Sequence, residues 1–208
     1  MNSNYVINIG RQLGSGGKEI GEKLAARLGI DFYDKELINL ASEESGLCKE
    51  FFEKADEKAS QGIIGGLFGM RFPFISEGAM PCNNCLSNDA LFKVQSDVIR
   101  HLAAEKSCVF VGRCADYILE DIPNHLNVYV YAPDEARLKN CVENLQMDPQ
   151  TAKKMMRDVD AARNRYHKAY IPGWQSVFDH KDLMIDSSRF GIDGTAKILA
   201  DIVKNQWG

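Results

Sequence analysis

The chain has 208 residues, of which 45% are hydrophobic and 26% charged, a composition typical of a globular domain with a substantial core. Its formal net charge of −4 argues against a general surface for nucleic acid or for an anionic membrane, so neither is expected as a partner. No apolar run reaches the roughly 18–20 residues of a membrane span, and no signal-peptide pattern is visible. Six scattered cysteines are typical of a reduced protein, and we expect a cytoplasmic location.

Short apolar runs alternate along the chain with stretches of helical periodicity. The apolar runs predict buried strands at residues 5–9, 30–34, 108–112, 126–132 and 182–186. The periodic stretches predict helices at residues 18–28, 35–45, 90–106, 133–144, 149–169 and 191–205. Because strands alternate with helices, we expect an α/β fold of three α/β/α layers around a mostly parallel, five-stranded sheet.

The segment 61–89 differs from the rest of the chain, because it is rich in glycine, proline and asparagine and carries several aromatic residues. We expect a mobile insertion there, and the role of its FGMRFPF stretch at 68–74 is left open. Cys82 and Cys85 form a C-x-x-C pair, but no second Cys/His pair stands at zinc spacing. A metal or redox site is therefore not the favoured interpretation.

The stretch GRQLGSGGKEIG at residues 10–21 contains five glycines. It leaves the first predicted strand and enters the first predicted helix, where free N–H groups and the positive end of the helix dipole form an anion site. Glycines allow phosphate oxygens to approach such a backbone closely. A tight structural turn is the plain alternative, and it rarely needs three glycines so close together. The stretch therefore predicts a phosphate-binding loop.

Two nucleotide-binding patterns compete for this loop. The P-loop pattern G-x-x-x-x-G-K-[ST] finds its G-K at residues 17–18, but Gln12 replaces its first glycine and Glu19 replaces its hydroxyl. A short-chain dehydrogenase would also fit the glycine spacing, with Asp31 or Asp34 on the ribose. That family also requires Tyr-x-x-x-Lys, and none of the seven tyrosines is followed by lysine four residues later. The loop alone does not decide between them.

Basic residues further along the chain favour phosphate chemistry. Arg113 follows the third predicted strand, on the same sheet edge as the loop, where a guanidinium can bind a phosphate with two parallel hydrogen bonds. The helical stretch 153–168 has six Lys or Arg against two Asp, and its spacing puts Asp160 near both Arg157 and Arg163. A solvated charged face is the plain alternative. Since such charges repel unless an anion neutralises them, we interpret the stretch as part of a phosphoryl-transfer site.

Three stretches carry a family resemblance: GRQLGSGGKEIGEKLAARLGIDFYDKELI, VGRCADYIL and RDVDAARNRYHKAY. They resemble the cytidylate kinase-like family, in the nucleoside monophosphate kinase group of the P-loop fold, over nearly the whole chain. The resemblance implies one domain, 1–208, with an acceptor-binding insertion at about 48–90 and a lid at about 137–168. It also implies transfer of the γ-phosphoryl group of ATP, bound with Mg²⁺, to a nucleoside monophosphate, CMP-like, or to a similar small phosphorylated acceptor.

The resemblance also assigns roles to individual residues. Those implied to bind the donor's phosphates are Gly10, Gly14, Ser15, Gly16, Gly17, Lys18 and Glu19. Those implied to bind the acceptor are Asp34, Arg113 and Asp160, and those implied to act in catalysis are Arg11, Lys18, Arg157, Arg163 and Arg165. The expected partners are a nucleoside triphosphate and a small phosphorylated acceptor, whereas the oligomeric state is not predicted.

The loop departs from the family pattern G-x-G-K-G-[ST]. When the glycines are aligned, Gly17 stands opposite the lysine and Glu19 opposite the hydroxyl. We expect Lys18 or Arg11 to supply the missing positive charge from a shifted position. No direct protein ligand to the metal ion is assigned, and Ser15 and Glu19 are the candidates. A second hypothesis is a nucleotide- or phosphate-binding regulatory protein that has kept the loop and lost the chemistry.

Overall fold

A computed structural model of the chain describes residues 4–34 and 88–208. The chain divides into two compact units, one of residues 1–34 and 99–208 and the other of residues 35–98. The predicted helix 35–45 and the C-x-x-C pair lie outside the described residues. So does the predicted insertion at about 48–90, except for its last three residues, which begin helix α4.

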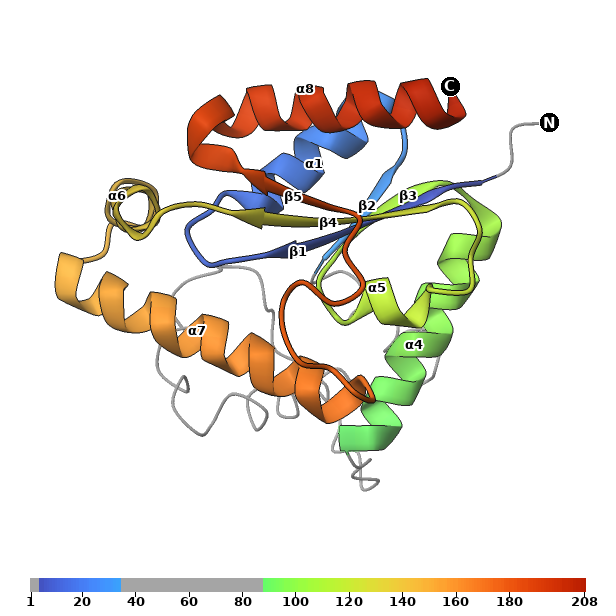
Figure 1. Ribbon diagram of the computed structural model, residues 1–208, viewed down its shortest axis with the longest axis horizontal. Coiled ribbons are helices and arrows are strands. Elements are labelled where there is room, and N and C mark those ends of the chain that lie inside the picture. Colours follow the sequence, from blue (N-terminus) through green and yellow to red (C-terminus); the bar gives the residue numbers. More distant parts are fainter. Residues whose placement is uncertain (1–3, 35–87) are drawn as a thin grey trace, which may run out of the picture. The chain divides into compact units, whose positions relative to one another are not determined.

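Five parallel strands form the sheet in the described part of the chain, in the order β2-β3-β1-β4-β5 (Figure 1). The strands are β1 (Val6–Arg11), β2 (Asp31–Tyr33), β3 (Cys108–Val111), β4 (His125–Tyr131) and β5 (Leu183–Asp186). The predicted α/β fold with a mostly parallel sheet of five strands is confirmed. Because the strands are parallel, the loops that follow β1, β2 and β3 meet at one edge of the sheet.

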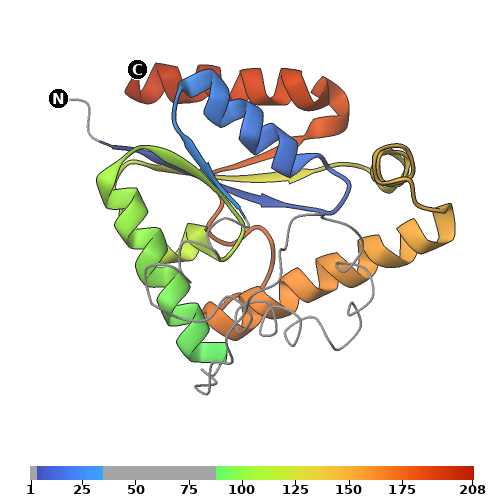
Figure 2. The same ribbon diagram turned by 180° about the vertical axis from the view of Figure 1, so that it is seen from behind.

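Helices cover both faces of this sheet. The described helices are α1 (Gly17–Leu28), α4 (Asn88–Glu105), α5 (Ala115–Ile118), α6 (Asp134–Leu145), α7 (Pro149–Tyr170) and α8 (Ser187–Trp207). Helices α1 and α8 lie on one face, whereas α5 and α7 lie on the other (Figures 1 and 2). None of the described helices is both long enough and apolar enough to cross a membrane.

The main core lies between the sheet and helices α1 and α8. Ile7 and Ile9 of β1 are fully buried there, together with Ile20 and Leu24 of α1. Since side chains of a strand alternate between faces, Arg11 follows Ile7 and Ile9 onto the face that α1 covers. The core packing of β1 therefore directs this arginine toward the start of α1.

Most predicted bounds shift by one or two residues in the structure, and the larger differences are at α5 and α8. β1 continues beyond Ile9, because Gly10 and Arg11 pair with Tyr129 and Val130 of β4. The four-residue helix α5 was not predicted, since it is too short for periodicity to reveal. α8 begins at Ser187 and kinks at Gly191, whose φ of 66° and ψ of 176° are not helical.

Candidate functional site

The loop between β1 and α1 depends on two glycines in left-handed conformations. Gly14 has φ 79° and Gly16 has φ 72°, a region that other residues rarely adopt. Space is also limited, since a Cβ on Gly14 would lie 2.6 Å from the carbonyl oxygen of Arg137 in α6. The loop thus packs directly against the α6 backbone and turns tightly into α1.

Five consecutive carbonyl oxygens, those of residues 11–15, accept hydrogen bonds from side chains. The donors are Arg163 Nη1 to Arg11 (2.8 Å), Ser15 Oγ to Gln12 (2.9 Å), Arg137 Nε to Leu13 (2.8 Å), Asn140 Nδ2 to Gly14 (3.0 Å) and Ser187 Oγ to Ser15 (2.7 Å). In a trans peptide the N–H points away from the carbonyl. The N–H groups of Gln12, Leu13 and Ser15 donate within the protein, to Val130 O, Asp160 Oδ1 and Gln12 O. Those of Gly14, Gly16 and the first turn of α1 are left as the N–H groups that can bind an anion.

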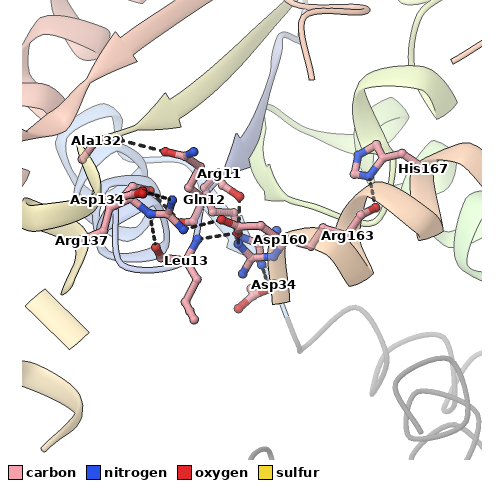
Figure 3. A network of polar contacts seen from close by, with 11 residues as sticks. Arg11, Gln12, Leu13, Asp34, Ala132, Asp134, Arg137, Asp160, Arg163 and His167 are labelled. Atoms are coloured by element: carbon pink, nitrogen blue, oxygen red, sulfur yellow. Dashed lines mark hydrogen bonds and ion pairs between the residues drawn. The ribbon is translucent and has the colours of Figure 1, made fainter. Parts of the chain in front are cut away.

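A closed ring of hydrogen bonds clamps the peptide groups of Leu13. Its N–H donates to Asp160 Oδ1 of α7 at 2.9 Å, and its carbonyl accepts from Arg137 of α6. Arg137 completes the ring by pairing with Asp160 Oδ2, and it also binds Asp134 at 3.1 Å (Figure 3). The side chain of Arg137 is only 6% exposed. The Arg137–Asp160 pair therefore joins two helices to the loop and fixes its shape.

Positive side chains gather beside the start of α1. Arg11 Nη2 lies 3.7 Å from Asp34 Oδ1, and Lys18 Nζ lies 3.3 Å from Asp34 Oδ2. The pKa of Arg11 is lowered to about 9, first by burial and then by the guanidinium of Arg163, with a smaller lowering by Arg113 and an opposing effect of Asp34. The guanidiniums of Arg163 and Arg113 thus both lie within electrostatic reach of Arg11. Such a group is stabilised by a bound anion.

Buried polar residues lie next to this cluster on the other face of the sheet. Tyr129 has its pKa raised to about 12, first by burial and then by Asp160. Lys181 pairs with Asp116, and both side chains are at most 10% exposed. Gly10 makes room for these neighbours, because a Cβ there would lie 2.8 Å from the Tyr129 ring and 3.3 Å from Lys181 Cε.

The structure brings most of the predicted site residues together. Those that lie in the loop, in the first turn of α1 or in contact with them are Arg11, Gly14, Ser15, Gly16, Gly17, Lys18, Glu19, Asp34, Asp160 and Arg163. Arg113, with φ 60°, lies close enough to Arg11 to affect its pKa. The ion pair of Asp160 with Arg163, 3.5 Å across one helical turn, is the one that their spacing predicts.

Other predicted residues lie elsewhere or are engaged differently. Arg157 and Arg165 are exposed, and Arg165 lies about 160° around α7 from Arg163, given about 100° per residue. Gly10 lies within β1, upstream of the loop. Ser15 is 3% exposed, and its hydroxyl donates to the Gln12 carbonyl. The roles that the resemblance implies for these residues, and for Asp160 as an acceptor ligand, stay predictions.

Sequence reasoning missed four residues that shape the site: Arg137, Asn140, Ser187 and Lys181. The first three bind loop carbonyls, and each comes from a helix distant in sequence. A signal for Arg137 was present, because it lies one helical turn before Cys141, a residue type that is usually buried. An arginine on a buried helix face needs a polar partner. Nothing in the local sequence identified that partner as the loop.

Comparisons with known proteins concern the family and the fold. A model of the cytidylate kinase-like family matches residues 6–189. A crystal structure of an uncharacterized protein from Eubacterium ventriosum is 24% identical with a TM-score of 0.68, covering 97% of this chain and 99% of that one. Shikimate kinase from Acinetobacter baumannii, in complex with shikimate, is 16% identical with a TM-score of 0.51. The match covers 100% of this chain and 97% of that one. Shikimate kinase from Bacteroides thetaiotaomicron is 12% identical with a TM-score of 0.54. The match covers 96% of this chain and 98% of that one. At these identities the likenesses show the fold alone. No curated protein matches the chain.

Proposed function

Because the chain belongs to the cytidylate kinase-like family, a family of kinase-like proteins, we propose that it is a phosphotransferase acting on nucleotides. The donor is a nucleoside triphosphate, ATP, and the acceptor is a nucleoside monophosphate of the CMP type or a similar small phosphorylated molecule. One observation carries this proposal. Arg113 and Arg163 lie within electrostatic reach of Arg11, beside a loop whose five carbonyls are held by side-chain donors and whose Gly14 and Gly16 N–H groups, with those of the first turn of α1, are left for an anion.

The arrangement suits the charge that phosphoryl transfer creates. An oxygen of the acceptor's phosphate forms a bond to the γ-phosphorus as the bond from that phosphorus to the β–γ bridging oxygen breaks, which yields ADP and a diphosphate. The acceptor oxygen is already anionic, so no side chain needs to remove a proton. Positioning and charge neutralisation supply most of the rate enhancement in such reactions. The loop N–H groups and the three guanidiniums provide both.

The donor is proposed to bind with Mg²⁺, which takes one or two carboxylates in addition to phosphate oxygens and water. Two carboxylates of the site fit this need: Asp34, beside Arg11 and Lys18, and Glu19, exposed on the first turn of α1. The Ser15 hydroxyl fits less well, because it is buried and donates to a carbonyl. When bound, the ion neutralises charge on the β- and γ-phosphate oxygens.

A nucleotide-binding protein without transfer activity is the second candidate. The sequence favours it at two positions, since Gly17 replaces the family's lysine and Glu19 replaces its hydroxyl. The retained guanidinium cluster argues against it, because simple nucleotide binding has less need of charge at the transferring phosphoryl group.

An ADP-release assay tests the proposal. Purified protein with ATP and Mg²⁺ is offered CMP, dCMP, UMP, AMP and GMP in turn, with shikimate as an acceptor that carries no phosphate. Acceptor-dependent ADP release with at least one monophosphate is the expected result. Binding of ATP in calorimetry without release for any acceptor would favour the binding protein. Absence of both would refute the nucleotide site.

A further inference from the structure

Positions 11 and 17 cannot both carry side chains in this fold. A Cβ on Gly17 would lie 2.5 Å from the Cβ of Arg11, closer than real Cβ contacts come, and a tight 3.1 Å from its Cγ. The next neighbour, Val130 Cβ at 3.4 Å, is an ordinary contact. Gly17 is the first residue of α1 and is not among the glycines with positive φ, so its backbone tolerates any side chain. Gly17 is therefore needed because Arg11 occupies the space beside it.

This pair explains how the loop departs from the P-loop pattern. With Gly16 as the second glycine of G-x-x-x-x-G-K, the first glycine falls on position 11 and the lysine on position 17. The chain has arginine where the pattern has glycine, and glycine where it has lysine. The other alignment puts the first glycine at Gln12, whose side-chain Oε1 instead accepts from the Ala132 N–H at 3.1 Å. Relative to the pattern, the glycine and the basic residue have changed places between positions 11 and 17.

The guanidinium of Arg11 is held in place at the sheet edge. A Cβ on Gly112, after β3, would overlap Arg11 Nη1, so this second glycine also makes room for the arginine. Asp34 lies on its other side at 3.7 Å, and Arg163 holds the Arg11 carbonyl at 2.8 Å. The side chain as a whole keeps 19% of its surface exposed. Lys18, in contrast, is 48% exposed and lies along α1 between Glu22 and Asp34.

We propose that Arg11 is the catalytic residue that replaces the P-loop lysine, and that it binds oxygens of the β- and γ-phosphates. This inference rests on the proposed function. Arg11 stays protonated and donates hydrogen bonds, while the bond from the γ-phosphorus to the bridging oxygen breaks and the bond to the acceptor oxygen forms. A guanidinium offers two parallel N–H donors to a phosphate, where lysine offers a single point of charge.

Returning the exchanged pair to the P-loop arrangement tests this assignment. The variants are Arg11→Gly, Gly17→Lys and the double variant that combines them, with Arg27→Gly on the exposed side of α1 as the matched loss of charge. Two readouts are used: ADP release with the best acceptor, and calorimetric binding of inorganic tripolyphosphate. Folding is checked by the fluorescence of Trp174 and Trp207, the chain's two tryptophans. Both belong to the unit of residues 1–34 and 99–208, which contains the sheet.

We expect Arg11→Gly to lower turnover roughly 10²-fold or more, as loss of one preorganised donor does. Gly17→Lys should also lose activity, because its Cβ meets that of Arg11. The double variant should be at least about 10-fold more active than Arg11→Gly, a coupling that independent sites do not show. The turnover of Arg11→Lys should lie between those of the wild-type protein and Arg11→Gly, since lysine keeps the charge without the paired donors.

Three results would overturn the inference. They are wild-type turnover in folded Arg11→Gly, a loss in Arg27→Gly as large as in Arg11→Gly, and a folded double variant no better than Arg11→Gly. If the double variant does not fold, Arg11→Lys decides, and turnover no higher than that of Arg11→Gly overturns the inference. If the wild-type protein releases no ADP, the proposed function fails, and tripolyphosphate binding in the same variants then decides the role of Arg11. A wild-type protein that binds no tripolyphosphate refutes both.

Discussion

Removing Arg137 from its ion pair with Asp160 should strongly destabilise the unit of residues 1–34 and 99–208. Arg137→Ala leaves the Asp160 carboxylate without its main partner and the Leu13 carbonyl without its donor. Removing one member of a buried pair costs about 3–5 kcal/mol. Because the Asp160 side chain keeps 22% exposure and water can compensate in part, we expect a loss near the lower end, about 3 kcal/mol.

Thermal unfolding followed by tryptophan fluorescence measures this loss. At about 2–4 °C for each kcal/mol in a chain of this size, the midpoint should fall by roughly 6–12 °C. Asp160→Asn should also destabilise, and the double variant should lose less than the sum of the single losses, because the two side chains contact each other.

Arg27→Ala is the matched control, because Arg27 forms an exposed pair with Asp193 at 3.7 Å, with side-chain exposures of 42% and 67%. Such exposed pairs contribute about 0–1 kcal/mol. If Arg137→Ala lowered the midpoint no more than this control does, the ring around Leu13 would not fix the loop, and the reasoning would be wrong.

Three further results are expected. The buried side chains of Asn8 and Asn127 are joined by a hydrogen bond of 2.8 Å from Asn8 Nδ2 to Asn127 Oδ1. Asn8→Val should lower the free energy of unfolding in urea by about 1–3 kcal/mol, because it leaves Asn127 without this donor. Adding Asn127→Val should recover part of that loss. Burial lowers the pKa of His167 below 6.5 in the folded protein. As the pH falls through 6.5, the unfolded chain therefore binds a proton at His167 more readily than the folded protein does, and the free energy of unfolding should decrease. His167→Gln should reduce that fall between about pH 7.5 and pH 5.5, and equal slopes in both proteins would contradict it. Arg163→Ala should reduce ADP release at least about 10-fold more than Arg165→Ala, since only Arg163 contacts the loop; equal losses would place Arg165 in the site.

The fold could be predicted from the sequence because its signals are local. Apolar runs such as CVFV in β3 and the stripe of Ile20 and Leu24 in α1 show which surfaces are buried, and their alternation determines the layers. The family resemblance was confirmed over residues 6–189. Strand bounds were less accurate where pairing extends a strand through a glycine, as it does at Gly10.

The site could be predicted only in part, because its contacts are long-range. The i,i+3 pair of Asp160 and Arg163 follows from helical spacing. The bond from Arg137 to Leu13 joins residues 124 positions apart, and no local pattern predicts such a contact. The sequence also left Lys18 and Arg11 as equal candidates for the missing charge. The proposal for Arg11 depends on the space beside Gly17, which is determined by how β1 meets α1.

The crowding between positions 11 and 17 also limits how such a loop can evolve. A chain with large side chains at both positions is overfilled, and a chain with glycine at both has no charge at either. A lineage that moves from one arrangement to the other must pass through one of these two intermediates. On the proposal that Arg11 supplies the charge, each intermediate is worse than either end point, and neither arrangement converts readily into the other. Arginine and glycine at these positions are therefore expected to be inherited together, as one character.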